Sequence, residues 1–379
     1  STIIEKTKEE IKDDDDLVSG NTESLVGDYI IHNPDYVNVA AYHLNLTEDG
    51  KGSIAAVNQV DITSWTNNDG NVELILAEPL ITSQSARPKS DGLGQPIVDD
   101  QGNIITENIV FKTSKLNFKV VSSNDVFRSI DLVTNTQRYI DGVLDETAQS
   151  NTSAISSNLL DKSKTLSVEK EDLVATWYLD VSESNYIDED APKVEKLTFN
   201  SDGTVSGGEA GETITWDVEN NVLTMNYTDA DYKGSASFWI TKSLSAGYQF
   251  VALDNGRINQ DGSVDSSDAH AKSEWGWLFK EDPDLVMTKQ DVIGRWTGFI
   301  GVKQDLYDLI IEEDLNVKLG LGESSYDGRF EDGIFYRELY IKNNDIVRFC
   351  DVAEDDCRLG ARMTHEFVAV ADDKYFIRR

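Results

Sequence analysis

The sequence predicts a mainly β protein built from three tandem antiparallel barrels or sandwiches, with a helical segment after the first. Three observations support this fold class: short runs of apolar/polar alternation, turn dipeptides between these runs, and a strand-and-turn pattern that occurs three times. In the clearest copy, a strand bearing Trp177 is followed by hairpins that turn at Asp202-Gly203 and Asn220-Asn221. Each copy independently indicates the same unit, so the repeat supports the architecture more strongly than any single motif.

The composition restricts the classes of partner. The chain has 379 residues, of which 39% are hydrophobic and 9% aromatic, so it is long enough for two or three domains. Its 34 basic and 69 acidic residues give a formal net charge of -35, which repels phosphate backbones and anionic lipid headgroups. We therefore predict no nucleic-acid partner. No apolar run approaches the roughly 20 residues that span a bilayer, so we expect no transmembrane segment.

The first 22 residues are strongly charged. They include four consecutive aspartates at positions 13–16, which resist burial together. We expect residues 1–22 to form a solvated acidic tail or tether. The chain starts at Ser1 without a signal peptide, which is compatible with a cytosolic protein and with a mature form that has lost a signal peptide or a lipid-anchored leader.

The first predicted β-domain spans residues 23–165. Alternation around Leu44 and Leu74 is typical of half-buried strands. From Ser123, a candidate N-cap, the apolar spacing becomes helical. One helical face would carry Val126, Ile130, Val133, Ile140 and Leu144. We therefore predict a helix packed against this domain, followed by a polar linker over residues 161–172.

The second predicted domain, residues 172–284, is rich in tryptophan. Trp275 and Trp277 are two residues apart in a strand pattern, so their side chains share one face. Together with Trp239 they form the candidate ligand site, because an exposed aromatic face stacks on a saccharide or a small amphipathic molecule. The alternative is that the same side chains pack in the protein core.

A long acidic loop near the end of this domain partly matches the spacing of calcium-binding loops. Oxygen-bearing side chains fall at the ligand positions Asn259, Asp261, Ser263, Asp265 and Asp268. However, Arg257 occupies the first position, where calcium needs a carboxylate, and no helical pattern flanks the loop. Two alternatives therefore stay open, a calcium site and an acidic loop without metal. Calcium is the one cofactor that the sequence suggests.

The third predicted domain spans residues 290–379 and contains both cysteines. Cys350 and Cys357 flank a short predicted turn, and a disulfide between them would stabilise the fold by about 2.5 kcal/mol on the chain-entropy estimate. Two reduced thiols are the alternative. Cysteines placed this close indicate an oxidising compartment. We therefore expect an exported protein, which is periplasmic, attached to the outer membrane or extracellular.

The opening strands of the three domains carry a resemblance to a known family. Gly-Arg-Trp at residues 294–296 resembles the Gly-x-Trp motif that opens the first strand in the lipocalin-like (calycin) families, and residues 27–29 and 175–177 are variants of it. The resemblance implies an antiparallel barrel in each domain, often with an internal cavity, as in secreted or periplasmic ligand carriers and lipoprotein modules. It also implies that a late basic residue covers the tryptophan, a role for Lys280 and for Arg378 or Arg379.

No motif indicates a reaction. The four histidines lack metal-binding spacing, and no nucleophile elbow, Walker loop or dinucleotide-binding glycine pattern is present. We therefore expect a non-catalytic exported or surface-associated binding protein for a saccharide or a small amphipathic ligand. Two alternatives remain. One is a structural or adhesive surface protein whose acidic loops bind calcium, and the other is a polysaccharide hydrolase with an unidentified carboxylate pair.

Overall fold

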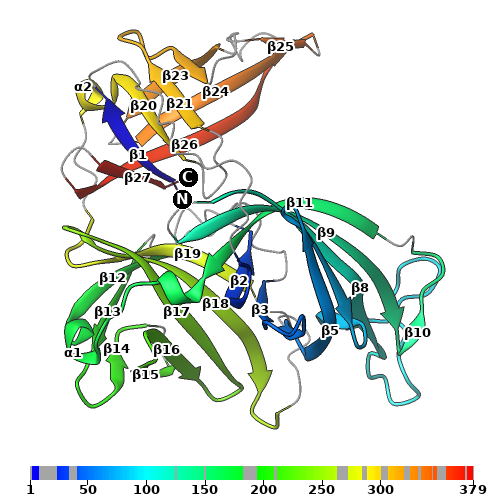
Figure 1. Ribbon diagram of the computed structural model, residues 1–379. Coiled ribbons are helices and arrows are strands. Elements are labelled where there is room, and N and C mark those ends of the chain that lie inside the picture. The colour runs from blue at the N-terminus through cyan, green and yellow to red at the C-terminus, as the bar shows by residue number, and fades with distance from the viewer. Residues whose placement is uncertain are drawn as a thin grey trace.

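The structure is a computed structural model that describes residues 2–7, 24–33, 41–123, 126–148, 151–181, 194–208, 211–262, 272–283, 288–299, 306–319, 325–331, 334–343, 345–347, 356–371 and 374–378. Antiparallel strands dominate these ranges and form three units (Figure 1). The expected mainly β fold is confirmed. No helix among the described residues is long and apolar enough to cross a bilayer.

The first unit contains a closed eight-stranded antiparallel barrel. Its strands are β2 (Gly27–His32), β3 (Tyr42–Leu46), β4 (Gly52–Ala55), β5 (Gln59–Asn68), β6 (Asn71–Leu76), β7 (Leu80–Pro88), β8 (Thr106–Ser123), β9 (Phe127–Ile140), β10 (Val143–Leu144) and β11 (Asn151–Asp161). The sheet order is β10-β9-β11-β2-β3-β4-β5-β6-β8-β7, and pairing of β8 with β9 closes the barrel. The edge strands β7 and β10 therefore lie outside the ring. A short 3-10 helix, η1 (Lys162–Lys164), follows β11.

The second unit is a closed barrel whose strands pair in sequence order. After α1 (Lys170–Leu173) come β12 (Thr176–Val181), β13 (Glu195–Phe199), β14 (Thr204–Ser206), β15 (Thr213–Glu219), β16 (Val222–Thr228), β17 (Tyr232–Leu244), β18 (Gly247–Asn259) and β19 (Lys272–Phe279). Pairing of β12 with β19 closes it. Large apolar side chains, including Trp177, Trp216, Phe238 and Phe250, fill the interior.

The third unit is a nine-stranded antiparallel sheet. It consists of α2 (Lys289–Val292), β20 (Gly294–Phe299), β21 (Leu306–Ile311), β22 (Val317–Leu319), β23 (Ser325–Glu331), β24 (Ile334–Lys342), β25 (Asp345–Val347), β26 (Cys357–Ala371) and β27 (Lys374–Arg378), together with β1 (Thr2–Thr7). The order is β23-β22-β21-β20-β1-β27-β26-β24-β25, and β23 also pairs with β24. The start of the chain is thus part of its last unit. The expected tail is wrong for Thr2–Thr7, while residues 8–22 of it lie outside the described residues.

The same turn joins the second and third strands of each unit. It occupies residues 47–51, 200–204 and 312–316. In each copy, the backbone N–H of the first residue of the turn donates to the carbonyl oxygen of the fifth residue, and the N–H of the fourth residue donates to the carbonyl oxygen of the first. The third residue is an aspartate whose carboxylate accepts from the fifth backbone N–H. The fourth residue has a positive φ in all three copies: 77° at Gly50, 86° at Gly203 and 65° at Leu315. The three units therefore share a local structure that the sequence pattern of turns already indicated.

The helix predicted from Ser123 to Leu144 is wrong, because most of this segment forms β9 and β10. In β9, Ile130, Leu132 and Thr134 are buried at two-residue spacing on the inner face of the barrel. The segment is rich in β-branched residues, which favour strands, and β9 gains hydrogen-bonded partners on both sides, β8 and β11. The helical spacing of the apolar residues is thus coincidental.

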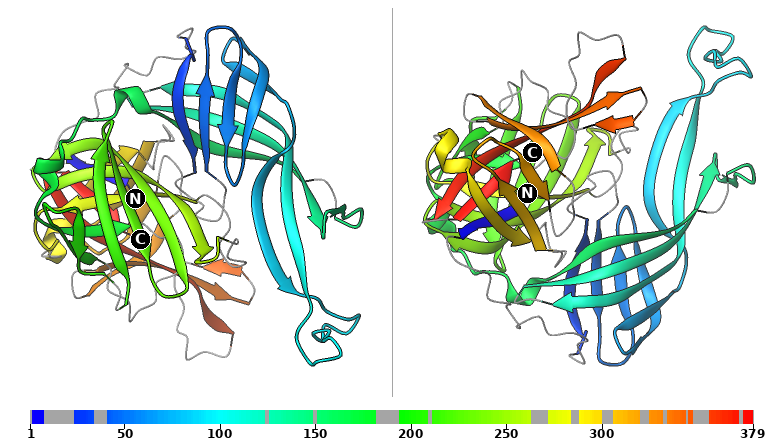
Figure 2. Two further views of the ribbon diagram at one scale, coloured as in Figure 1. Left: turned by 90° about the horizontal axis from the view of Figure 1, so that it is seen from below. Right: turned by 90° about the horizontal axis from the view of Figure 1, so that it is seen from above.

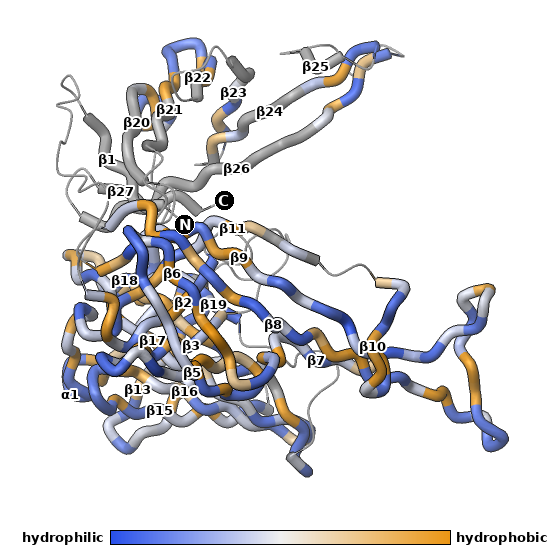
Figure 3. The backbone as a smooth tube through the Cα atoms, turned by 45° about the vertical axis from the view of Figure 1, so that its right-hand side comes forward, coloured by the Kyte–Doolittle hydropathy of each residue, from blue (hydrophilic) through white to orange (hydrophobic). Residues whose placement is uncertain are grey.

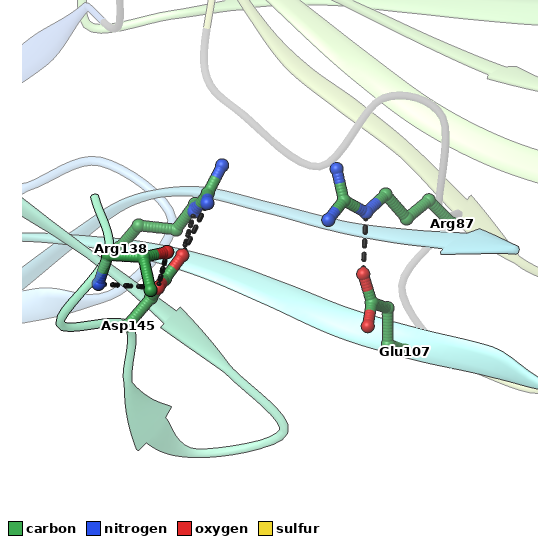
Figure 4. Close-up of polar contacts among 5 residues, drawn as sticks. Arg87, Glu107, Arg138 and Asp145 are labelled. Carbon is green, nitrogen blue, oxygen red and sulfur yellow. Dashed lines mark hydrogen bonds and ion pairs between the residues drawn. The ribbon is translucent and has the colours of Figure 1, made fainter. Parts of the chain in front are cut away.

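A long ribbon, here called the arm, projects from the first barrel (Figure 2). It comprises β7, the first half of β8, the second half of β9, and β10, and hydrophobic and hydrophilic stretches alternate along it (Figure 3). Two ion pairs hold its strands together (Figure 4). Arg87 Nε donates to Glu107 Oε1 across β7 and β8 at 2.6 Å, and Arg138 Nε donates to Asp145 Oδ2 at 2.8 Å. The Thr147 hydroxyl and the Arg138 guanidinium lower the pKa of Asp145 to about 2.

Candidate functional site

The three tryptophans of the predicted ligand site lie outside the core of the second barrel. Trp275 and Trp277 share one face of β19 and Trp239 lies on β17, whereas the interior is filled by alternate residues such as Phe238 and Leu278. All three side chains are nevertheless buried, with exposed fractions of 6% for Trp275, 0% for Trp277 and 4% for Trp239. An aromatic face that is this buried has no area free for stacking on a ligand.

The first barrel covers two of these tryptophans. Trp239 and Trp275 form one apolar cluster with residues of the first unit, among them Ile30, Phe127 and Leu160. The rings of Phe127 and Trp275 have centroids 6.1 Å apart. We call this cluster the barrel interface, because its members come from the outer faces of two different barrels. It holds the two units together through packed aromatic area.

Trp277 packs differently. Its ring is stacked on that of Phe279, with centroids 5.7 Å apart, and Tyr178 and Leu244 pack against the pair. The burial of all three tryptophans therefore favours the packing role that the sequence left open as the alternative to a stacking platform.

Two histidines lie beside the barrel interface, of which His43 is half-buried and His32 is buried. The imidazole of His43 lies against the Trp239 ring at 5.8 Å between centroids, and its Nδ1 lies 3.1 Å from Lys162 Nζ. His32 is 1% exposed, and its ring is tilted by 54° relative to the Phe127 ring, with centroids 5.8 Å apart. Neither ring nitrogen of His32 has a hydrogen-bond partner among the described residues. Burial lowers the pKa of His32 to about 3. Burial and the nearby Lys162 ammonium lower that of His43 to about 4.

Because the pKa values of both histidines are lowered in the folded protein, we expect the protein to lose stability in mild acid. The unfolded chain takes up a proton at each histidine near pH 6.5, whereas the folded protein does not until pH falls to about 3 at His32, so the stability declines over that window. Between pH 7 and pH 5 the expected loss from His32 alone is about 2 kcal/mol. Urea unfolding at both pH values should show a smaller loss for His32→Leu than for the wild-type protein. Equal losses for the two proteins would rule His32 out as the source.

The structure describes only part of the predicted calcium loop. Asn259 ends β18, and its carbonyl oxygen accepts from Gly262 N at 2.9 Å in a turn that includes Asp261. Ser263, Asp265 and Asp268 lie outside the described residues. Within the described ranges, no group of three or more His, Cys, Asp or Glu side chains is placed to hold a metal ion. The calcium alternative stays a prediction.

Two other predictions concern the disulfide of the third unit and the basic residues expected to cover a tryptophan in the second and third units. Cys357 is disulfide-bonded, and Cys350, the only other cysteine of the chain, lies outside the described residues. No cation-π contact of the described residues joins Lys280 to Trp177. Instead, Trp177 packs on Tyr248 with centroids 5.4 Å apart, and its indole N–H donates to the Leu173 carbonyl oxygen at 2.9 Å. The side chain of Arg378 and the whole of Arg379 are not described.

A groove on the outer face of the first barrel offers an open site instead. It crosses the adjacent strands β6, β8, β9 and β11 and has a volume of about 550 Å³, within the range of small-molecule sites. The strand register places its outward-facing side chains in two rows. The first row is Asn71, Lys119, Asp131 and Ser156. The second row is Glu73, Asn117, Val133 and Ala154. We call this site the sheet groove.

The sheet groove combines hydrogen-bond donors and acceptors with some apolar area. Glu73 and Asp131 supply carboxylate acceptors, and Lys119 supplies an ammonium donor. The side-chain amides of the two asparagines supply both donors and acceptors. The Ser156 hydroxyl lies 3.4 Å from Asp131 Oδ1, a long donor-acceptor distance. This mixture suits a neutral ligand rich in hydroxyl groups, because every hydroxyl both donates and accepts.

The tip of the arm is a second exposed feature. Apolar side chains stand out into solvent there, at Leu93 (87% exposed), Val98, Ile104, Ile105, Val143 (70% exposed) and Leu144. They come from the loop between β7 and β8 and from β10. Exposed apolar residues gathered at one end of a molecule are typical of surfaces that contact another molecule.

Comparison with known proteins adds no further assignment, since no protein-family model and no curated protein matches this chain. The sequence patterns also missed the sheet groove. Alternation around Leu74 does place Glu73 on the solvent-facing side of its strand. The helical spacing that predicts a helix over Asp131 and Val133, however, conceals that these residues lie on a strand of the groove.

Proposed function

We propose that this chain is a non-catalytic, exported binding protein for a saccharide, and that the sheet groove is its binding site. The observation that carries the proposal is the pair of parallel side-chain rows across four adjacent strands. A rigid barrel wall holds these rows in place, so a ligand meets a preorganised set of polar groups and loses little affinity to ordering the protein. Neither histidine nor cysteine lines the groove.

The chemistry of the groove favours a saccharide over an anion. Its two carboxylates outnumber its one ammonium group, so a phosphate or a carboxylate ligand would meet net repulsion. A neutral sugar avoids this repulsion and places its C–H faces against Val133 and Ala154. The disulfide-bonded state of Cys357 supports export, because disulfides persist in oxidising compartments.

We further propose that the three units are lipocalin-like repeats and that the third sheet is a barrel like the other two. Their shared turn supports this, as does the start of each unit. A buried apolar residue precedes the aromatic residue of the first strand by four positions in the first two units, at Leu25 and Tyr29 and at Leu173 and Trp177. The third unit repeats the pattern with Val292, which is buried, and Trp296.

The tryptophans that contact the shared turn strengthen this proposal. Trp65 N donates to Gly50 O and Trp216 N donates to Gly203 O, each at 2.8 Å. Their indole N–H groups donate to the carbonyl oxygen of the first residue of the same turn, at 3.1 Å and 3.0 Å. The two barrels thus use equivalent tryptophans at equivalent places.

Substitution in the groove tests the proposed function. Asp131→Ala should weaken binding of a neutral oligosaccharide at least tenfold, because it removes a hydrogen-bond acceptor that faces the ligand. Titration calorimetry of the full chain against a panel of neutral oligosaccharides would measure this. Asp61→Ala is the matched control, since Asp61 is an exposed carboxylate on β5 outside the groove. Absence of binding across the panel, or equal affinities for both variants, would refute the proposal.

A structural or adhesive role is the second candidate, and the arm favours it. The arm projects from the first barrel, carries exposed apolar residues at its tip and is braced by two ion pairs. If the oligosaccharide panel shows no binding, this role becomes the better account of the structure.

A further inference from the structure

The third unit differs from the other two at one position of its sheet. In the first barrel the first strand, β2, pairs directly with the last, β11, and in the second barrel β12 pairs directly with β19. In the third unit, β20 and β27 have β1 between them instead (Figure 1). We call the space between β20 and β27 the strand slot.

The strand that fills the slot comes from far away in the sequence. β1 ends at Thr7 and β20 begins at Gly294, a separation of 287 positions (294 minus 7). β1 runs antiparallel to both neighbours, and Ile4 lies opposite Gly298 on one side and Tyr375 on the other. Without β1, the facing edges of β20 and β27 would present unpaired backbone N–H and C=O groups, which bind strands readily.

We propose that the strand slot is a strand-binding site that accepts β1 from a second copy of this chain, so that the protein forms strand-exchanged dimers or longer assemblies. A second copy is the partner because β1 already fits the slot in register on both sides. The contacts are the same whether β1 belongs to the same chain or to another, so exchange alters only the connectivity.

The covalent connection between β1 and β2 determines the protein concentration at which exchange occurs. Residues 8–26 join β1 to β2, and these 19 residues (26 minus 8 plus 1) span at most about 65 Å when fully extended. Such a tether gives β1 an effective concentration on the order of millimolar at its own slot, so the intrachain arrangement dominates in dilute solution. Exchange requires release of only the six residues of β1, whereas swapping the whole first barrel would require breaking the barrel interface with the second.

Two experiments with the full chain test this. In the first, wild-type chains with two different affinity tags are mixed at high concentration and purified through one tag at that concentration. We expect the second tag to be recovered with the first, and recovery to fall at least tenfold when both chains carry Ile4→Pro. Proline removes a backbone N–H and fixes φ, so it prevents pairing within a central strand. Failure of the wild-type chains to purify together would overturn the proposal. This outcome does not depend on whether the Ile4→Pro variant folds.

In the second experiment a fluorescent peptide of residues 1–9 is titrated into the Ile4→Pro chain, and anisotropy is measured. The peptide should bind saturably and bind wild-type protein at least tenfold more weakly, since wild-type β1 already occupies the slot. The same peptide carrying Ile4→Pro should not bind. If a scrambled peptide of the same composition binds equally well, the slot does not select its own strand and the assignment of a second copy as partner is wrong.

Discussion

Replacing Trp275 by alanine is expected to lower the free energy of unfolding by about 3–5 kcal/mol, the usual cost of truncating a buried tryptophan. Trp275 is 6% exposed and packs on Phe127 across the barrel interface, so its loss leaves a cavity between two units. The partners lie on curved barrel walls that are fixed by their own hydrogen bonds and do not collapse readily into that space. Chemical denaturation followed by circular dichroism would measure the loss.

An exposed apolar residue provides the control for this experiment. Ile75 is 60% exposed on β6, and Ile75→Ala should change the stability by less than about 0.5 kcal/mol. The folded Trp275→Ala protein should keep its affinity for saccharide, because Trp275 does not line the sheet groove. Unchanged stability together with lost ligand affinity would show that Trp275 is a ligand-stacking residue and that its packing role is wrong.

Gly276→Ala is expected to disrupt the second barrel at the point where it closes. Gly276 lies between the two tryptophans of β19 and pairs with Phe250 on one side and Val181 on the other. A Cβ atom on Gly276 would lie 1.9 Å from the Asp180 carbonyl oxygen and 3.0 Å from the Phe250 ring. The first distance is far inside van der Waals contact with backbone, so β12 and β19 would have to separate. The expected cost is about 3 kcal/mol or more.

Scanning calorimetry should show this cost as a lower unfolding temperature for the second barrel. Gly92→Ala is the matched control, since a Cβ atom there meets nothing within 4 Å, and we expect it to leave the transition unchanged. A Gly276→Ala protein that melts with the wild type would mean that β12 and β19 do not approach as closely as described.

The sequence alone was sufficient for features that depend on neighbouring residues. The turns at Asp49-Gly50 and Asp202-Gly203 were predictable because an aspartate accepts from the backbone two residues later and glycine adopts positive φ without strain. The shared face of Trp275 and Trp277 followed from the two-residue period of a strand. These signals act over a few residues, so they are visible without the fold.

Features that depend on distant segments were decided by the tertiary structure. Strand period places two tryptophans on one face, but only the docking of the first barrel shows that Trp275 lies at an interface between units. The segment containing Ile130 fits a helix or a strand by spacing, and pairing with β8 and β11 selects the strand. Thr2–Thr7 carry no local sign that their partners are almost 300 residues away. Pairing and burial between remote segments supply the free energy that chooses among conformations that local preferences leave nearly equal.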